Sequence, residues 1–169
     1  LLACYCLLTR FEAYLKIMKK LPKIALVLII IFANIAADQV TKVMARNQIE
    51  YNETINVIGD YLIFTKVENT GAFLGMGSEL SPFLRTALLL ILPSLVMIGV
   101  FVYIIRTKYL TNISLWGLSF IVGGGIGILF DRIVYGSVTD MIFLDFQFAH
   151  TGIFNVADMS VMVGTGLIL

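Results

Sequence analysis

Apolar residues are concentrated in four long runs, and polar stretches separate these runs from one another. A membrane-spanning helix needs about 20 consecutive apolar residues, and each of the first three runs supplies roughly that length. The pattern therefore predicts an all-α polytopic membrane protein with four transmembrane helices, at about residues 22–46, 82–105, 113–130 and 154–169. The fourth run has room for only about 15 residues before Leu169, so we expect the natural chain to be longer.

The polar stretches carry a different periodicity, in which apolar and polar residues alternate. Such alternation is typical of half-buried β-strands, and it occurs at residues 54–58, 61–67 and 139–146. Gly59 and Asp60 separate the first two runs, and glycine at the first position of a two-residue connection favours a hairpin turn. We therefore expect a small extracytoplasmic β-cradle, formed by about residues 47–81 and 131–153.

Composition supports the membrane assignment and excludes several kinds of site. Hydrophobic residues make up 59% of the chain and charged residues 14%, which is typical of a polytopic membrane protein. One histidine, His150, and two closely spaced cysteines cannot form a zinc-type centre. Composition leaves open a carboxylate site for a hard cation, but no stretch resembles a dedicated loop for one, so we expect no metal and no cofactor. The net charge is only +1 and no basic face is visible, so we expect no nucleic-acid partner.

Basic residues indicate how the chain is oriented in the membrane. Several lysines, among them Lys20 and Lys23, precede the first apolar run, and Arg106 and Lys108 follow the second. Because positively charged residues are retained on the cytoplasmic side, the N-terminus is expected in the cytoplasm. Asp38, near the far end of the first run, is then expected at the outer face.

The first residues of the chain differ in character from the membrane-spanning pattern of the remainder. Residues 1–17 contain no methionine and are too interrupted to span a membrane, so we expect a non-native segment and a natural start at Met18. An amphipathic cytosolic lead helix is the alternative. The run after Pro22 could also be a signal peptide ending at Ala36 and Ala37, but the helical pattern continues to about Arg46 and favours a transmembrane helix.

Aspartates occur where the predicted helices reach the outer face. Ionisable residues at membrane depth are costly and rare, and they usually mark a functional site that faces the interior of the bundle. Two of these aspartates have basic neighbours that favour a structural role. Asp38 lies four residues before Lys42 on one helical face, and Asp131 precedes Arg132.

Asp140 and Asp158 have no basic neighbour in the sequence, which makes them the better acid and base candidates. Two carboxylates placed close together share a proton, so one can activate water while the other donates to a substrate carbonyl. The pair then titrates as a unit. A structural role for these residues as helix caps is the alternative.

A glycine-rich segment, Gly123 to Gly127, precedes Asp131 and Arg132. Small residues let membrane helices approach closely, so the segment can serve helix packing. It can equally serve the site, by fixing the position of Asp131. A phosphate-binding loop is not expected, because the usual Gly-Lys-Ser/Thr ending and the preceding soluble strand are absent.

Five motifs occur in the order seen in the lipoprotein signal peptidases, also called signal peptidase II, and residues 18–169 resemble that family. The motifs are Asp38-Gln39-x-Thr41-Lys42, Asn69-x-Gly71-Ala72-Phe73, the glycine-rich run ending in Asp131-Arg132, Val138-x-Asp140, and Phe154-Asn155-x-Ala157-Asp158. The resemblance implies a four-helix aspartyl peptidase of the bacterial inner membrane with a small β-cradle at its periplasmic face. It also implies cleavage of diacylglyceryl-modified prolipoproteins just before the lipidated cysteine.

The resemblance further implies roles for single residues. Asp140 and Asp158 would be the catalytic pair. Three residues would bind substrate and orient the pair: Asn69, Arg132 and Asn155. Five would support the site: Asp38, Lys42, Gly71, Asp131 and Ala157. The implied partners are the prolipoprotein and the lipid bilayer, and we expect the protein to act as a monomer.

One position departs from the family pattern. Three residues before Asp131 the family usually has asparagine, and this chain has Ile128. Two other functions are compatible with the sequence: a small transporter or proton-relay component, and a non-catalytic membrane scaffold. The transporter requires acids near the middle of the bilayer, whereas the aspartates here are expected at the outer ends of the helices.

Overall fold

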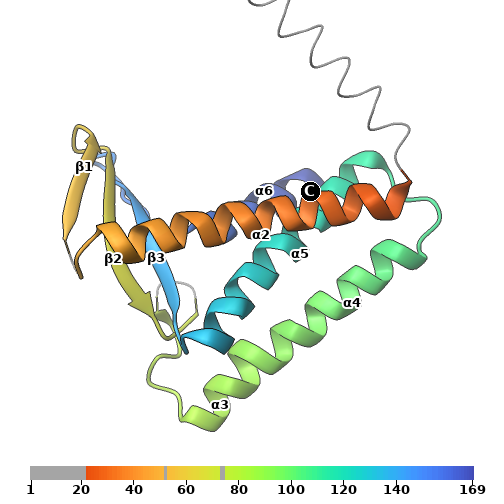
Figure 1. Ribbon diagram of the computed structural model, residues 1–169, viewed down its shortest axis with the longest axis horizontal. Coiled ribbons are helices and arrows are strands. Elements are labelled where there is room, and N and C mark those ends of the chain that lie inside the picture. Colours follow the sequence, from red (N-terminus) through yellow and green to blue (C-terminus); the bar gives the residue numbers. More distant parts are fainter. Residues whose placement is uncertain (1–21, 52, 73–74) are drawn as a thin grey trace, which may run out of the picture.

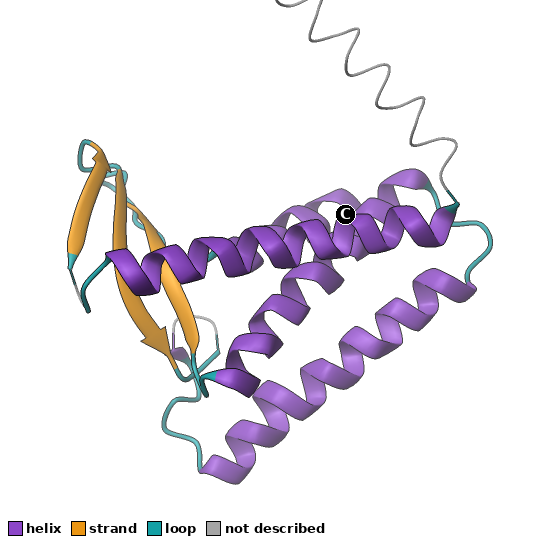
Figure 2. Cartoon of the chain, viewed as in Figure 1, coloured by secondary structure: helices purple, strands orange, loops and turns teal. Residues whose placement is uncertain are grey.

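The computed structural model describes residues 22–51, 53–72 and 75–169. The expected start at Met18 and the lead segment 1–17 lie outside this range. The described residues form a helical bundle with a small sheet at one end (Figures 1 and 2). The elements, in chain order, are α2 (Lys23–Gln48), β1 (Thr54–Ile58), β2 (Leu62–Asn69), α3 (Pro82–Thr86), the π-helical turn Ala87–Ile91, α4 (Leu92–Arg106), α5 (Asn112–Val134), β3 (Val138–Leu144) and α6 (Val156–Ile168).

Three helices in the described part of the chain are long and apolar enough to cross a membrane. The first is α2 and the third is α5. The second is the continuous rod in which α3, the π-helical turn and α4 follow one another. The fourth, α6, is apolar but has 13 residues. The expected third helix, 113–130, ends later than predicted, at Val134, so Asp131 and Arg132 lie within its last turns.

α5 is the centre of the bundle, and α2, α4 and α6 pack against it. Its glycines allow this close approach. A Cβ atom at Gly124 would lie 2.5 Å from the carbonyl oxygen of Ala157 on α6, and one at Gly127 would lie 2.6 Å from a carboxylate oxygen of Asp38 on α2. The glycine run therefore does serve helix packing, and this packing brings Asp38 and the start of α6 together.

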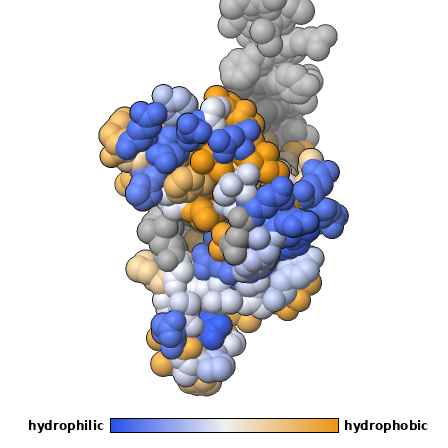
Figure 3. All heavy atoms as spheres, turned by 90° about the vertical axis from the view of Figure 1, so that its left-hand side faces the viewer, coloured by the Kyte–Doolittle hydropathy of each residue, from blue (hydrophilic) through white to orange (hydrophobic). Residues whose placement is uncertain are grey.

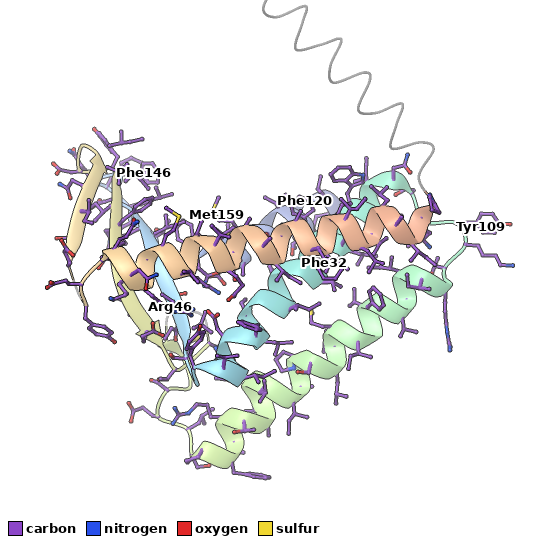
Figure 4. The ribbon with its side chains drawn as sticks, viewed as in Figure 1. Phe32, Arg46, Tyr109, Phe120, Phe146 and Met159 are labelled. Carbon is purple, nitrogen blue, oxygen red and sulfur yellow. The ribbon has the colours of Figure 1, made fainter. Side chains whose placement is uncertain are left out.

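The helices α2 and α4 meet at the end of the bundle opposite the sheet and diverge toward the sheet (Figure 1). The Lys23 ammonium group, at the start of α2, donates hydrogen bonds to the carbonyl oxygens of Ile104 and Thr107 at the end of α4. Tyr109, in the loop after α4, projects from this end and is 94% exposed (Figure 4).

The sheet is antiparallel, with strand order β1-β2-β3. The predicted hairpin is confirmed, and Gly59 in its turn has a positive φ of 51°, a conformation that glycine adopts without strain. The predicted third strand is also confirmed. Its register with β2 places Asp140 opposite Val67 and Val138 opposite Asn69, so the two strands carry Asp140 and Asn69 to the same edge of the bundle.

Viewed from the sheet end, the molecule presents many polar side chains, with apolar residues exposed between them (Figure 3). Apolar side chains along the helices are exposed on the outside of the bundle, among them Phe32 and Leu95. An outward apolar surface on long helices is what a lipid environment requires.

Candidate active site

The four aspartates singled out from the sequence lie together at the sheet end of the bundle. Asp140 is on β3 and Asp158 is in the first turn of α6. Both line a cavity of about 260 Å³, together with three predicted site residues, Asn69, Arg132 and Asn155. Asp38 and Asp131 lie in a separate buried cluster next to it.

Asp140 is held by two amide side chains, one on each carboxylate oxygen. The Nδ2 atom of Asn69 donates to Oδ2 at 3.0 Å, and that of Asn155 donates to Oδ1 at 2.6 Å. The residue is only 4% exposed. Burial raises the pKa of Asp140 to about 6; the two amide hydrogen bonds oppose this shift, and the negative charge of Asp158 adds to it.

Asn155 connects the two aspartates. It is the N-cap of α6: its backbone N–H donates to Asp158 Oδ2 at 3.1 Å, and its side-chain oxygen accepts from the Asp158 N–H at 3.0 Å. This reciprocal capping box stabilises the helix start and fixes the rotamer of Asp158. The side-chain nitrogen of Asn155, which takes no part in the capping box, donates to Asp140. One asparagine thus positions both carboxylates.

The supporting cluster contains a fully buried lysine between two fully buried aspartates. The Lys42 ammonium group lies 2.8 Å from a carboxylate oxygen of Asp38 and 2.8 Å from one of Asp131. The other oxygen of Asp38 accepts the backbone N–H of Ala157 at 2.9 Å. The cluster therefore joins α2, α5 and the start of α6, next to Asp158.

The expected pairing of Asp38 with Lys42 is confirmed, whereas the pairing of Asp131 with Arg132 is wrong. Consecutive residues on a helix point in directions about 100° apart. Asp131 faces α2, where it pairs with Lys42 and with Arg46 at 3.2 Å. Arg132 faces the cavity, and its guanidinium group donates to the carbonyl oxygen of Gly71.

Gly71 lies in a tight turn after β2. Its N–H donates to the side-chain oxygen of Asn69 at 2.9 Å, and its carbonyl oxygen accepts from Arg132. A Cβ atom here would overlap the backbone of Gly75, so only glycine fits. The turn orients Asn69 toward Asp140 and fixes Arg132 at the edge of the cavity.

Sequence reasoning missed Arg46. Its Nε atom donates to Thr139 on β3 at 2.8 Å, and its guanidinium group lies 3.8 Å from the ring centroid of Tyr135. The side chain extends from the end of α2 toward β3 and α5 (Figure 4). The signal was its spacing, because Asp38, Lys42 and Arg46 recur every four residues on one helical face.

The second predicted helix also contributes to the cavity, which the sequence did not indicate. Leu89, Pro93 and Met97 form one wall, and Ile128 on α5 lies on the facing side. The cavity thus has a polar end, at the two aspartates, and an apolar end between the helices. Among the described residues no group of histidine, cysteine and acidic side chains could hold a metal ion.

This arrangement can carry out acid and base chemistry on a carbonyl group. The carboxylate of Asp140 is buried and that of Asp158 is half-buried. Both line the same cavity, and the negative charge of Asp158 raises the pKa of Asp140. Such a pair favours the singly ionised state, in which one carboxylate is a base and the other an acid. The described residues that line this cavity include no serine, cysteine or histidine.

Comparison with known proteins places the chain in a family. Residues 19–169 match the family model described as Signal peptidase (SPase) II. Proteins named lipoprotein signal peptidase are similar over most of their length. The protein from Clostridium novyi is 37% identical, and the match covers 82% of this chain and 90% of that protein. The protein from Clostridium tetani is 38% identical, and the match covers 84% of this chain and 88% of that protein.

A solved bacterial membrane enzyme structure at 2.3 Å resolution superposes with a TM-score of 0.76. It is 26% identical in sequence, and the match covers 86% of this chain and 85% of that chain. A further bacterial membrane enzyme structure, at 1.9 Å resolution, gives a TM-score of 0.74 at 26% identity. Since a family model matches nearly the whole chain and relatives of similar length agree with it, the chain belongs to the signal peptidase II family, whose members are multi-pass membrane peptidases.

Proposed function

We propose that this protein removes the signal peptide of diacylglyceryl-modified prolipoproteins, cutting just before the lipidated cysteine, and that it is an aspartyl endopeptidase. The observation that carries the proposal is the pair of carboxylates formed by buried Asp140 and half-buried Asp158. Asn155 contacts both of them, and they line one cavity that continues between apolar helices. The similar proteins are named lipoprotein signal peptidase, which supports the removal of a prolipoprotein signal peptide.

In the proposed reaction the pair holds one proton. The ionised carboxylate takes a proton from a water molecule as its oxygen attacks the scissile carbonyl carbon, and the protonated one donates to the carbonyl oxygen. The tetrahedral intermediate then collapses, the C–N bond breaks and the amine leaves with a proton from the pair. The step consumes one water molecule and needs no metal or cofactor.

The neighbouring residues have separate tasks in this scheme. Asn69 and Asn155 orient Asp140, and Asn155 also orients Asp158. Arg132, at the edge of the cavity, is placed to hold the substrate backbone. The supporting residues keep the elements together and do not line the cavity: Asp38, Lys42, Gly71, Asp131 and Ala157.

The shape of the bundle suits a substrate that arrives from the bilayer. An apolar cavity of about 590 Å³ lies between α2, α4 and α5, and it shares Met97 and Leu129 with the site cavity. A signal helix or acyl chain in the membrane could therefore reach the two aspartates without crossing a polar surface. We place the protein in the bacterial inner membrane as a monomer, with residues 18–169 as one peptidase domain.

In this orientation the sheet and the active site face the periplasm and the N-terminus lies in the cytoplasm. Lys23, Arg106 and Lys108 lie at the end of the described bundle away from the sheet, where they are not accompanied by acidic residues of the described ranges. Basic residues that flank the ends of the helices favour the cytoplasmic side. The aspartates at the opposite end lie where water can reach them. A proton-relay role is less well supported, because that role requires acids near the middle of the helices.

The test is cleavage of a diacylglyceryl-modified prolipoprotein by the purified protein in detergent or bilayer. The wild type should release the signal peptide. Asp140→Asn and Asp158→Asn should each reduce cleavage by at least about 1,000-fold, because either change removes one half of the acid and base pair. Asp60→Asn, at the exposed hairpin turn, is the matched control and should retain activity. Cleavage by both site variants would exclude the aspartyl mechanism.

Ile128 allows a second test of the same site. Ile128 lines the same cavity as Asp140, Asp158 and Met97. If the wild type cleaves the substrate slowly, Ile128→Asn should accelerate cleavage by supplying an amide group to the substrate or to the pair. A protein that stays inactive with either residue would support the scaffold function instead.

A further inference from the structure

A second cavity adjoins the active site on the side of the α3–α4 rod. It has a volume of about 340 Å³ and lies at the sheet end of the bundle. It shares Leu89 and Arg132 with the active-site cavity, so the two cavities are neighbours along α5. Its lining residues are Pro82, Arg85, Thr86, Leu89, Leu90, Arg132 and Gly136.

Two arginines from different helices line this cavity, and none of the described residues that line it is acidic. Arg85 comes from α3 and Arg132 from α5, and their positive charges are close enough to repel each other. Within the described ranges neither arginine forms an ion pair with a carboxylate. The charges of Asp140, Asp131 and Asp158 offset part of the charge of Arg132. Arg85 has no ion pair within the described ranges, so a bound anion would supply its counter-charge.

Arg85 also carries an unsatisfied hydrogen-bond donor. Its Nε atom is buried and has no partner among residues 22–51, 53–72 and 75–169. Glu79, the acid on the preceding loop, is exposed and forms no ion pair with it. A buried donor without a partner is costly, and a bound ligand with acceptor oxygens would satisfy it.

The two guanidinium groups that line the cavity suit a ligand with several negatively charged oxygens, such as a tetrahedral oxyanion. A guanidinium group presents parallel N–H donors that match the oxygens of a phosphate, and two such groups can share one phosphate. The hydroxyl group of Thr86 lies in the same lining and could donate to it. We propose that this cavity binds a phosphate group, carried either by the headgroup of a membrane phospholipid or by inorganic phosphate.

The surroundings of the cavity make a phospholipid headgroup accessible. Phe83, Leu88 and Ile91 on the same rod are 80%, 46% and 53% exposed, as expected for side chains in contact with lipid. The rod begins at Pro82, so Arg85 lies one turn from its end. A long basic side chain near the end of a membrane-spanning helix can extend to the headgroup region. A lipid whose chains lie against the rod can therefore bring its phosphate to Arg85.

The experiment measures ligand binding to the full chain in a neutral detergent. Three probes are titrated separately: a short-chain phosphatidylglycerol, short-chain diacylglycerol without a phosphate, and inorganic phosphate. Arg85→Gln is compared with Arg106→Gln, which removes an arginine from the opposite end of the same rod. Arg85→Lys keeps the charge, and thermal unfolding verifies that each variant folds.

The wild type and Arg106→Gln should bind the phospholipid equally. Arg85→Gln should weaken binding of the phospholipid about 10- to 100-fold, since one charge-assisted pair of hydrogen bonds is lost. The affinity of Arg85→Lys should lie between those of the wild type and Arg85→Gln. Diacylglycerol should show no dependence on Arg85. Binding of inorganic phosphate with the same dependence on Arg85 would identify free phosphate as the ligand. Equal binding of every probe by the wild type and Arg85→Gln would overturn the proposal. Because the readout is binding, the result is independent of peptidase activity.

Discussion

Replacement of Asp140 by asparagine tests the electrostatics of the site through stability, without any substrate. The carboxyl group of Asp140 has its pKa raised to about 6 in the folded protein, mainly by burial, against a usual value of 3.8. The folded state therefore holds the proton more tightly than the unfolded state. The tighter binding of this proton stabilises the folded state. This stabilisation is present in full at a pH below the unfolded pKa of about 3.8, and it is lost as the pH rises through about 6.

The size of the effect follows from the difference between the two pKa values. One pKa unit corresponds to about 1.4 kcal/mol, so the wild type should lose about 3 kcal/mol in all through this group. About 2 kcal/mol of this loss falls between pH 4 and pH 8, because the unfolded group is already partly ionised at pH 4. The asparagine side chain of the Asp140→Asn variant does not ionise, so the variant loses none of it. The variant also changes a hydrogen bond, since the new amide group faces the donors of Asn69 and Asn155, but that cost does not depend on pH.

The assay is thermal unfolding of the wild type and Asp140→Asn in detergent from pH 4 to pH 8. As the pH rises, the unfolding temperature of the wild type should fall by several degrees relative to that of the variant. Most of this change should occur between pH 4 and pH 6.5. Asp60→Asn, at the exposed turn of the hairpin, should show no such trend. A constant difference between the wild type and Asp140→Asn across this range would refute the conclusion that burial raises the pKa of Asp140.

Two further changes test the neighbours of the pair. Lys42→Met should leave Asp38 and Asp131 buried without their shared cation and cost about 3–5 kcal/mol; an unchanged unfolding temperature would contradict the role of the cluster. Asn69→Ala removes an amide donor that stabilises ionised Asp140, so the pKa of Asp140 should rise further. The corresponding limb of the pH profile of kcat/KM should move to higher pH, and a shift to lower pH would contradict this.

Some features of the site could be predicted because they are local. The spacing of Asp38 and Lys42 identifies an ion pair, since residues four apart on a helix are neighbours wherever the helix lies. The hairpin around Gly59 is local for the same reason. The motif order identified Asp140 and Asp158 as residues of one site, and the structure places both on one cavity.

Other features depend on packing between segments far apart in the chain. Asp131 pairs with Lys42 and Arg46 and not with the adjacent Arg132, because the direction in which each side chain points depends on which helix lies beside α5. The wall formed by Leu89 and Met97 could not be predicted either, since nothing in an apolar run indicates which face meets the site.

The sequence by itself determined the apolar helices, the strands and the acids at their ends, because periodicity and hydropathy act over a few residues. Only the tertiary structure decided which acids are paired with cations and which remain available for chemistry. Glycines on α5 allow α2 and α6 to approach, and this approach buries Lys42 between Asp38 and Asp131. The hydrogen-bond partners of the Asp140 carboxylate are two amide groups. Burial raises its pKa by more than these hydrogen bonds and the more distant charge of Lys42 lower it.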